Sequence, residues 1–147
     1  MLRVGVTELN IGFENREEAK KRCLEVMEEA CANGVELLVF PEMTLTGFTM
    51  RPWLYAESWD ADNIPDSVSF FMENSRKYKM QMAFGYIRAV MADGSLVNDE
   101  MKEKAYENRL VLVDGGNVLL DYAKIHPFSY SGEDKVYRAG EKLYRHR

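Results

Sequence analysis

A short apolar run between a glycine and a proline constrains the fold of this chain most. Residues 37–40 read LLVF, and they lie between Gly34 and Pro41. Such a run, with a β-branched and an aromatic residue, is typical of a strand buried on both faces of an α/β sheet. Pro41 ends the strand because it has no N–H to donate. Glu42 then places a carboxylate at the strand end, where open α/β sheets bind ligands. A solvated or turn-capping glutamate is the alternative interpretation.

The segment before this run predicts a strand–helix–strand unit. Residues 3–11 begin with apolar alternation and indicate a first strand. Asn15 is a typical N-cap, with Glu18 in the capping-box position. The helix that follows ends at residues 33–34, an Asn-Gly stop. Its apolar face is formed at helical spacing by Ala19, Cys23, Val26, Met27 and Ala30. The crossover between the two strands should be right-handed.

The rest of the chain predicts one more helix and three more strands. Asp66 is expected to cap a helix that runs to about residue 78, and residues 80–91 are expected to form a strand. A strand over 109–113 and one over 118–125 are joined by the hairpin turn DGGN at 114–117. Residues 43–63 are irregular and rich in aromatic rings, which either wall a pocket or simply pack. Residues 93–94 indicate a turn, and residues 98–107 a solvated, charged excursion.

Composition bounds the class of protein. The length of 147 residues fits one domain over 1–147, and 46% hydrophobic with 29% charged residues is an ordinary globular mixture. A net charge of −5 argues against a nucleic-acid partner, and no apolar run is long enough to span a membrane. Two cysteines and a first strand that begins at once predict a cytoplasmic protein with reduced thiols. His126 and His146 have no cysteine spaced to join them, so neither a metal nor a cofactor is predicted.

Three ionisable residues near strand ends are candidates for chemistry. Glu42 and Lys124 each follow an apolar strand, and Glu133 lies on the loop after Lys124. If they meet, each holds the other charged, with Glu42 as the expected buried acid. A general base beside an oxyanion stabiliser is then possible, although each residue alone could simply be solvated. Cys23 and Cys31 fall inside the first helix, where small buried side chains are expected rather than nucleophiles.

Two ordered motifs resemble those of the nitrilase, or carbon–nitrogen hydrolase, superfamily. Residues 37–48 (LLVFPEMTLTGF) resemble its glutamate motif, and residues 122–128 (YAKIHPF) resemble its lysine motif. Asn108 and the turn at 114–115 fit the same pattern, so agreement runs from residue 2 to about residue 140. The resemblance implies an α-β-β-α sandwich that hydrolyses non-peptide C–N bonds of small amides or nitriles through a cysteine thioester. It implies that Glu42 is the base, that Lys124 stabilises the tetrahedral intermediate and that Glu133 is a second, structural acid.

The sequence departs from that family at the nucleophile. The family's cysteine lies on a strand after the lysine motif, and these 147 residues contain no such segment. We therefore expect a truncated, incomplete sandwich that is inactive alone, because a glutamate base needs a thiol to deprotonate. Half a sandwich exposes an apolar sheet face, so a homo-oligomer or a companion chain is expected to cover it. The alternatives are a non-catalytic module that keeps the Glu/Lys pocket for a small ligand, and an unrelated α/β domain.

Overall fold

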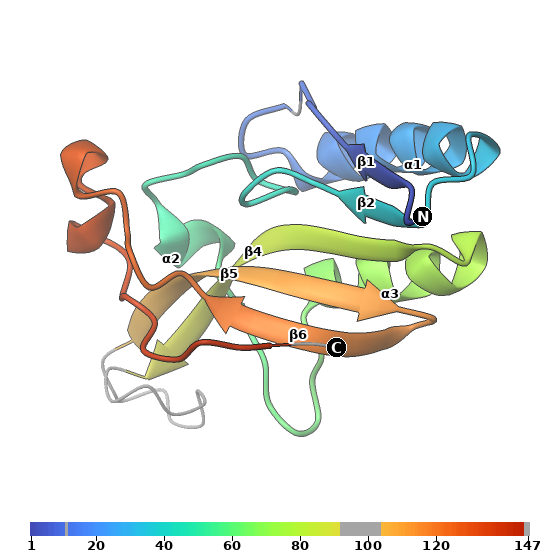
Figure 1. Ribbon diagram of the computed structural model, residues 1–147. Coiled ribbons are helices and arrows are strands. Elements are labelled where there is room, and N and C mark those ends of the chain that lie inside the picture. The colour runs from blue at the N-terminus through green and yellow to red at the C-terminus, as the bar shows by residue number, and fades with distance from the viewer. Residues whose placement is uncertain (11, 92–103, 146–147) are drawn as a thin grey trace.

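The computed structural model describes residues 1–10, 12–91 and 104–145, which form a mixed sheet with helices on one face (Figure 1). The strands are ordered β1-β2-β4-β5-β6, and β3 pairs with β4. In chain order the elements are β1 (Val4–Val6), α1 (Arg16–Ala32), β2 (Leu37–Val39), α2 (Pro52–Tyr55), β3 (Glu57–Ser58), α3 (Asp66–Tyr78), β4 (Gln81–Met91), β5 (Lys104–Asp114), β6 (Asn117–Ala123), and the short 3-10 helices η1 (Ser129–Ser131) and η2 (Glu133–Lys135). The predicted α/β class is confirmed.

The sheet is parallel on one side and antiparallel on the other. β1, β2 and β4 are parallel, whereas β4, β5 and β6 form an antiparallel meander. The predicted hairpin turn joins β5 to β6, with φ of 55° at Gly115 and 83° at Gly116. Only glycine takes positive φ twice in succession at low cost, which explains the DGGN signal. β2 and β6 therefore run in the same direction and end at the same edge of the sheet.

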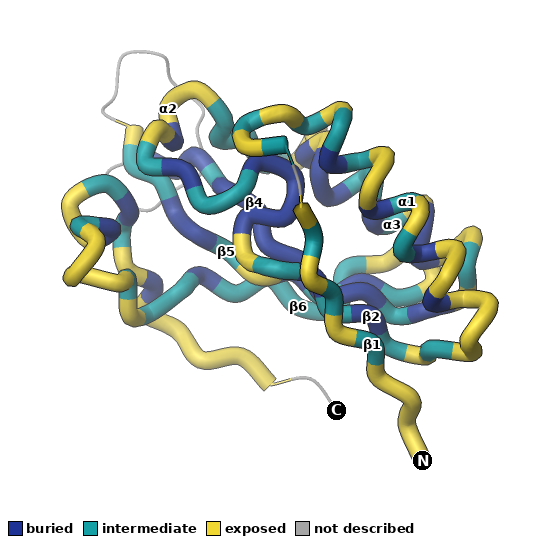
Figure 2. Tube along the Cα trace, turned by 90° about the horizontal axis from the view of Figure 1, so that it is seen from above, coloured by how far each residue is buried: buried dark blue, intermediate teal, exposed yellow. Residues whose placement is uncertain are grey.

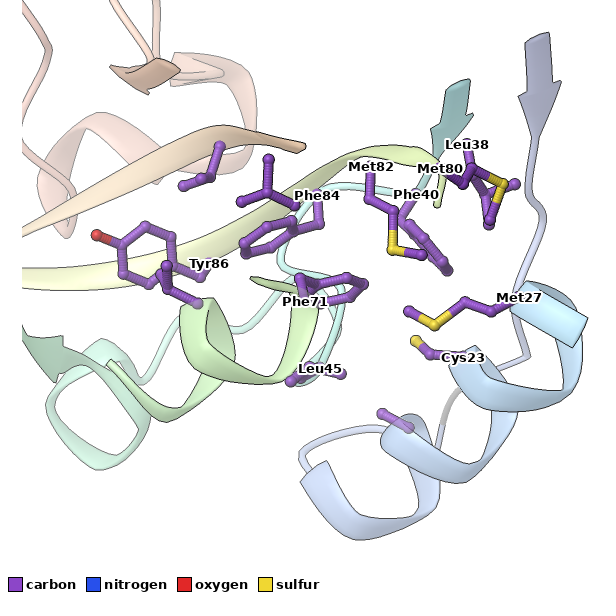
Figure 3. Packing of buried hydrophobic residues seen from close by; sticks show 14 of the residues in the cluster. Cys23, Met27, Leu38, Phe40, Leu45, Phe71, Met80, Met82, Phe84 and Tyr86 are labelled. Carbon is purple, nitrogen blue, oxygen red and sulfur yellow. The ribbon is translucent and has the colours of Figure 1, made fainter. Parts of the chain in front are cut away.

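The main core lies between the sheet and helices α1 and α3. Phe71 of α3 stacks on Phe84 of β4 with ring centroids 3.9 Å apart, and it meets Phe40 edge-on at 5.0 Å. Cys23 and Met27 of α1 point into the same cluster (Figure 3). Buried residues follow β4 and β5 through the middle of the molecule, while the outer helix surfaces are exposed (Figure 2). Burial of these rings and aliphatic side chains holds both helices on this face.

The opposite face of the sheet is only partly covered. At one end, Met43, Ile87 and Tyr137 form a second buried cluster. Elsewhere Val4 is 49%, Val6 80% and Leu110 41% exposed. Strand register puts these three on the face away from α1 and α3, because alternate residues of a strand point to opposite faces. The described residues thus supply one helical layer and one sheet layer of the expected sandwich.

The helix boundaries agree with the sequence except at the start of α3. Asn15 caps α1, and its side chain accepts a hydrogen bond from the Glu18 backbone N–H. The prediction that Asp66 caps α3 is wrong, because Pro65 occupies that position and Asp66 instead pairs with a lysine of α1. Glu57 supplies the missing cap by accepting from the backbone N–H of Ser67 at 2.9 Å. None of the described helices has the length and apolar character needed to cross a membrane.

Three loop assignments need correction. β1 covers only Val4–Val6, and residues 43–63 include α2 and β3 rather than being wholly irregular. Residues 104–107 belong to β5, so the predicted solvated excursion is wrong there. Glu107 is 8% exposed because its carboxylate pairs with Arg109. Residues 98–103 and the turn predicted at 93–94 lie outside the described residues.

Candidate active site

The loop after β2 carries Glu42 across the sheet at a glycine of β4. Thr44 and Gly85 exchange two hydrogen bonds, from Thr44 N to Gly85 O at 2.9 Å and from Gly85 N to Thr44 Oγ1 at 3.1 Å. A Cβ on Gly85 would lie 2.4 Å from Met43 N and 3.0 Å from Glu42 Cα. Only glycine allows so close an approach of two backbones. Glu42 is thereby fixed over the sheet face that α1 and α3 leave free.

Lys124 comes to the same place from the end of β6. Its backbone N–H donates to Asn108 O at 2.8 Å, which continues the β5–β6 pairing by one residue. Its Nζ donates to Glu42 Oε1 at 2.8 Å and to Glu133 Oε2 at 2.9 Å. In Figure 1, β2 and β6 both run toward the orange-red turns at 129–135 that contain Glu133. The structure therefore brings together all three site residues proposed from the sequence.

Glu133 is the buried acid of the cluster. Its side chain is 0% exposed, whereas that of Glu42 is 42% exposed. Glu133 Oε2 also accepts from the backbone N–H of Phe128 at 2.5 Å. The expectation that Glu42 is the buried partner of Lys124 is therefore wrong. The loop over residues 126–137 folds Glu133 inward, and nothing in its own sequence neighbourhood signals that burial.

Asn108 of β5 is a fourth member that the sequence marked only through the family resemblance. It is 4% exposed, and its Nδ2 donates to Glu42 Oε1 at 2.5 Å and to Glu133 Oε1 at 2.9 Å. Asn108 and Lys124 therefore each bridge the two glutamates. No signal in the residues around it marked Asn108, because the glutamate and the arginine on either side of it are charged.

The two glutamates differ in which oxygens are engaged. Both oxygens of Glu133 accept hydrogen bonds, Oε1 from Asn108 and Oε2 from Lys124 and Phe128. Glu42 accepts its two bonds at Oε1. Among the described residues, nothing donates to its Oε2. Glu42 is thus the acid with a free lone pair, and a carboxylate of this kind can take a proton from a bound group.

The cluster keeps its charges. Burial raises the pKa of Glu133, but the Phe128 N–H, the Asn108 amide and the Lys124 ammonium lower it more, so the net shift is downward. Partial burial lowers the pKa of Lys124, while hydrogen bonds to both glutamates raise it above its ordinary value. Two carboxylates and one ammonium give the site a formal charge of −1. An ammonium held this way is a permanent donor beside a base.

Two hollows adjoin the cluster on the face away from the helices. One of about 760 Å³ is lined by residues from the glutamate loop and the loop after β6: Glu42, Phe48, Lys124, His126, Pro127, Phe128, Ser129 and Ser131. The other, of about 250 Å³, includes Gly85, Asn108, Leu110 and Tyr122. Phe48 lines the first hollow, while Trp59 packs on the core and on Arg88. The aromatic loop therefore contributes both a pocket wall and plain packing.

No described residue supplies a nucleophilic thiol at this site. Cys23 is buried in the core on the helical face, and burial raises its pKa to about 12. Cys31 is exposed near the end of α1, with Sγ 3.9 Å from Tyr78 O. A reactive thiol needs an electropositive, accessible setting. Within residues 1–10, 12–91 and 104–145, no three His, Cys, Asp or Glu side chains cluster as metal ligands.

Comparison with known proteins gives a family match along almost the whole sequence. The model for the carbon-nitrogen hydrolase family matches residues 3–146. An arylacetonitrilase from Aspergillus niger is 26% identical over 132 residues, which are 86% of this chain and 38% of that protein. A glutamine-dependent NAD(+) synthetase from Thermotoga maritima is 27% identical over 144 residues, 97% of this chain and 23% of that protein.

Solved structures show the same fold. Nit3 of Saccharomyces cerevisiae, a member of branch 10 of the nitrilase superfamily, matches with a TM-score of 0.78 at 17% identity, over 96% of this chain and 49% of that chain. A glutamate-to-glutamine mutant of the amidase from Nesterenkonia sp. AN1, which carries acrylamide added to its active-site cysteine, matches with a TM-score of 0.75 at 14% identity, over 97% of this chain and 51% of that chain. The chain thus spans about half the length of these structures.

Proposed function

The chain belongs to the carbon–nitrogen hydrolase family, and we propose that it supplies the Glu42–Lys124–Glu133 part of an active site that hydrolyses small amides or nitriles. Family membership rules out the unrelated α/β domain. The observation that carries the proposal is that Lys124 Nζ donates to both glutamates while one oxygen of Glu42 stays free. A fixed base beside a fixed cation is what acyl transfer requires.

Each residue has one role in the proposed reaction. A cysteine thiol from outside these 147 residues gives its proton to Oε2 of Glu42, and the thiolate attacks the carbonyl or nitrile carbon. The Lys124 ammonium stabilises the negative charge that develops on the substrate oxygen or nitrogen. For an amide, Glu42 returns its proton to the leaving amine, and a thioester forms. For a nitrile, Glu42 gives its proton to the nitrogen, which forms a thioimidate; a first water adds to its carbon and ammonia leaves, which gives the same thioester. Water, deprotonated by Glu42, then releases the acid and the thiol. Glu133 holds Lys124 in place.

We propose that these 147 residues are inactive by themselves, as a truncated domain. Support comes from the positions of Cys23 and Cys31, which both belong to α1 on the helical side of the sheet, and from the active-site cysteine of the Nesterenkonia amidase. That amidase also supports amides as a substrate class, and the Aspergillus relative supports nitriles. Two free cysteines support a cytoplasmic location.

The partly bare sheet face supports a partner as well. We propose that a second copy or a companion polypeptide covers Val4, Val6 and Leu110, beside the Lys124 site. Sedimentation velocity of the 147-residue chain at micromolar concentration should show association. Val6→Glu should weaken association, while Phe13→Glu, at a residue that is also exposed (64% against 80%) but lies outside the sheet, should not. If the unmodified chain sediments as a monomer, self-association is contradicted, and a companion polypeptide remains the proposed partner.

Ammonia release from an aromatic amide and the matching nitrile tests the reaction. We expect none from the chain alone, and release when a downstream-encoded polypeptide carrying the cysteine strand is added. Glu42→Gln should then lower turnover by about 10²–10⁴-fold. The matched control is Glu36→Gln, at the other end of β2, where the carboxylate accepts from the backbone N–H of Arg3 and, within the described residues, from no other group. Turnover by the chain alone, retained after both cysteines are changed to serine, would overturn the proposal.

A second function is favoured by one observation. The hollow of about 760 Å³ is formed without a cysteine among the described residues that line it. A non-catalytic module would bind a small amide there with Glu42 and Lys124 as its polar contacts. Amide binding that Lys124→Met abolishes, with no hydrolysis in any combination, would support this function instead.

A further inference from the structure

We propose that Asn108 is a positioning residue of this site, whose amide group fixes Glu42 with Oε2 turned toward the substrate hollow. This inference rests on the proposed function, because an oriented base matters only if the base is used. Asn108 is itself one of the residues that line the smaller hollow. It acts through Glu42 and Glu133 rather than on the reacting atoms.

The first argument is geometric. One nitrogen, Nδ2, reaches Glu42 at 2.5 Å and Glu133 at 2.9 Å, so each of its two hydrogens has its own acceptor. The backbone carbonyl of the same residue accepts from Lys124 N at 2.8 Å. A single strand residue therefore sets the spacing of both acids and of the lysine. Asn108 is 4% exposed and lies within paired strands, so its side chain cannot move along with the two glutamates and the lysine.

The second argument concerns charge. Two carboxylates share one ammonium, so one negative charge must be balanced by neutral donors. The Asn108 amide and the Phe128 N–H are the neutral donors of the cluster. Aspartate at 108 would add a third negative charge, serine has a single hydrogen to donate, and glutamine is longer by a methylene. Asparagine is the side chain whose length and two hydrogens match both acids.

The third argument concerns which oxygen is used. Asn108 and Lys124 both donate to Oε1 of Glu42, from β5 and from the end of β6. Two donors from different directions leave the carboxylate one low-energy orientation, with Oε2 outward. With Lys124 alone, the carboxylate could turn about its one hydrogen bond to the ammonium, because a single donor does not fix the plane of the group. Asn108 thus fixes the orientation of the Glu42 carboxylate, which the ion pair with Lys124 does not fix by itself.

The test is a carbon-13 NMR titration of the Glu133 carboxyl in the 147-residue chain, with the signal assigned by Glu133→Gln. In Asn108→Ala, the pKa of Glu133 should rise by about one unit or more, because a hydrogen bond to its charged form is lost. The control is Asn74→Ala. Asn74 is similarly buried, but its amide donates to the backbone carbonyl of Phe70, so the Glu133 titration should not move.

An unchanged titration of Glu133 in Asn108→Ala would overturn the proposal. If Asn108→Ala does not fold, Asn108→Ser is the variant to titrate. Serine keeps one hydroxyl hydrogen, so the pKa of Glu133 should rise by less than in Asn108→Ala. An unchanged pKa of Glu133 in Asn108→Ser would again overturn the proposal. In the complex with a cysteine-bearing partner, Asn108→Ala should lower kcat with little change in KM. A shifted titration without any hydrolysis in the unmodified complex would refute the proposed function and leave the positioning role. Hydrolysis by the unmodified complex, with no shift of the Glu133 titration in Asn108→Ala, would support the proposed function and refute the positioning role of Asn108.

Discussion

The unequal surroundings of Glu42 and Glu133 decide what each residue can do. Glu133 is fully buried and engaged at both oxygens, whereas Glu42 is partly exposed and engaged at one. The sequence pointed to Glu42 and Lys124 because each follows an apolar strand, and to Glu133 because it lies on the loop after Lys124 and fits the family pattern. It did not predict which acid is buried. That depends on how the loop over 126–137 closes on β5, and a glutamate in a polar loop carries no local signal for it.

The two glutamates should therefore respond differently to the same substitution. Glu133→Gln should lower the free energy of unfolding by about 3–5 kcal/mol, because the one NH₂ group of glutamine must face either the buried Asn108 amide or the Lys124 ammonium and the Phe128 N–H. Glu42→Gln should cost about 0–1 kcal/mol, because its ion pair is partly solvated. Urea unfolding at neutral pH measures both. Equal losses of unfolding free energy in the two variants, or a larger loss in Glu42→Gln, would contradict the assignment of Glu133 as the acid that stabilises the cluster.

At the scale of elements, strand ends and one glycine place the site. The apolar run at 37–40, the helix capped by Asn15 and the DGGN hairpin were all predictable, since each has a strong local signal. The start of β5 was not. Glu107 pairs with Arg109 two residues along the same strand, and Arg109 pairs in turn with Asp121 of β6. Pairing of that kind cannot be inferred from the charge of a single segment.

The contact at Gly85 gives a test at this scale. Gly85→Ala should destabilise the protein by about 1–3 kcal/mol, because the new methyl meets the Met43 backbone at 2.4 Å. Gly5→Ala in β1 is the control. Its methyl would meet only the movable side chains of Leu38 and Val35 at 3.0 and 3.2 Å, so the cost should stay within about 1 kcal/mol. Thermal unfolding compares them, and equal costs would argue against a backbone crossing at Gly85.

Over the whole molecule, burial and pairing predict a window of constant stability. The pKa of Glu133 is lowered from 4.5, so its contribution is present above pH 4.5 and is lost as the pH falls through the folded-state value. The pKa values of Cys23 and Lys124 are raised from 9.0 and 10.5, so their contributions are complete below those values and decline as the pH rises. Urea midpoints should therefore be flat between these limits. Glu133→Gln should flatten the acid limb and reduce the part of the alkaline limb that Lys124 contributes, because Glu133 helps to raise the pKa of Lys124. An unchanged acid limb would show that Glu133 is not its source.

The most direct test of the Glu42–Lys124–Glu133 cluster is a nitrogen-15 NMR titration of the Lys124 ammonium. Lys124 should titrate above its ordinary pKa of 10.5, because hydrogen bonds to both glutamates outweigh its partial burial. Its pKa should fall in Glu42→Gln and again in Glu133→Gln, and it should not change in the control Glu36→Gln. A Lys124 that titrates at its ordinary value, with no response to either site substitution, would contradict the account.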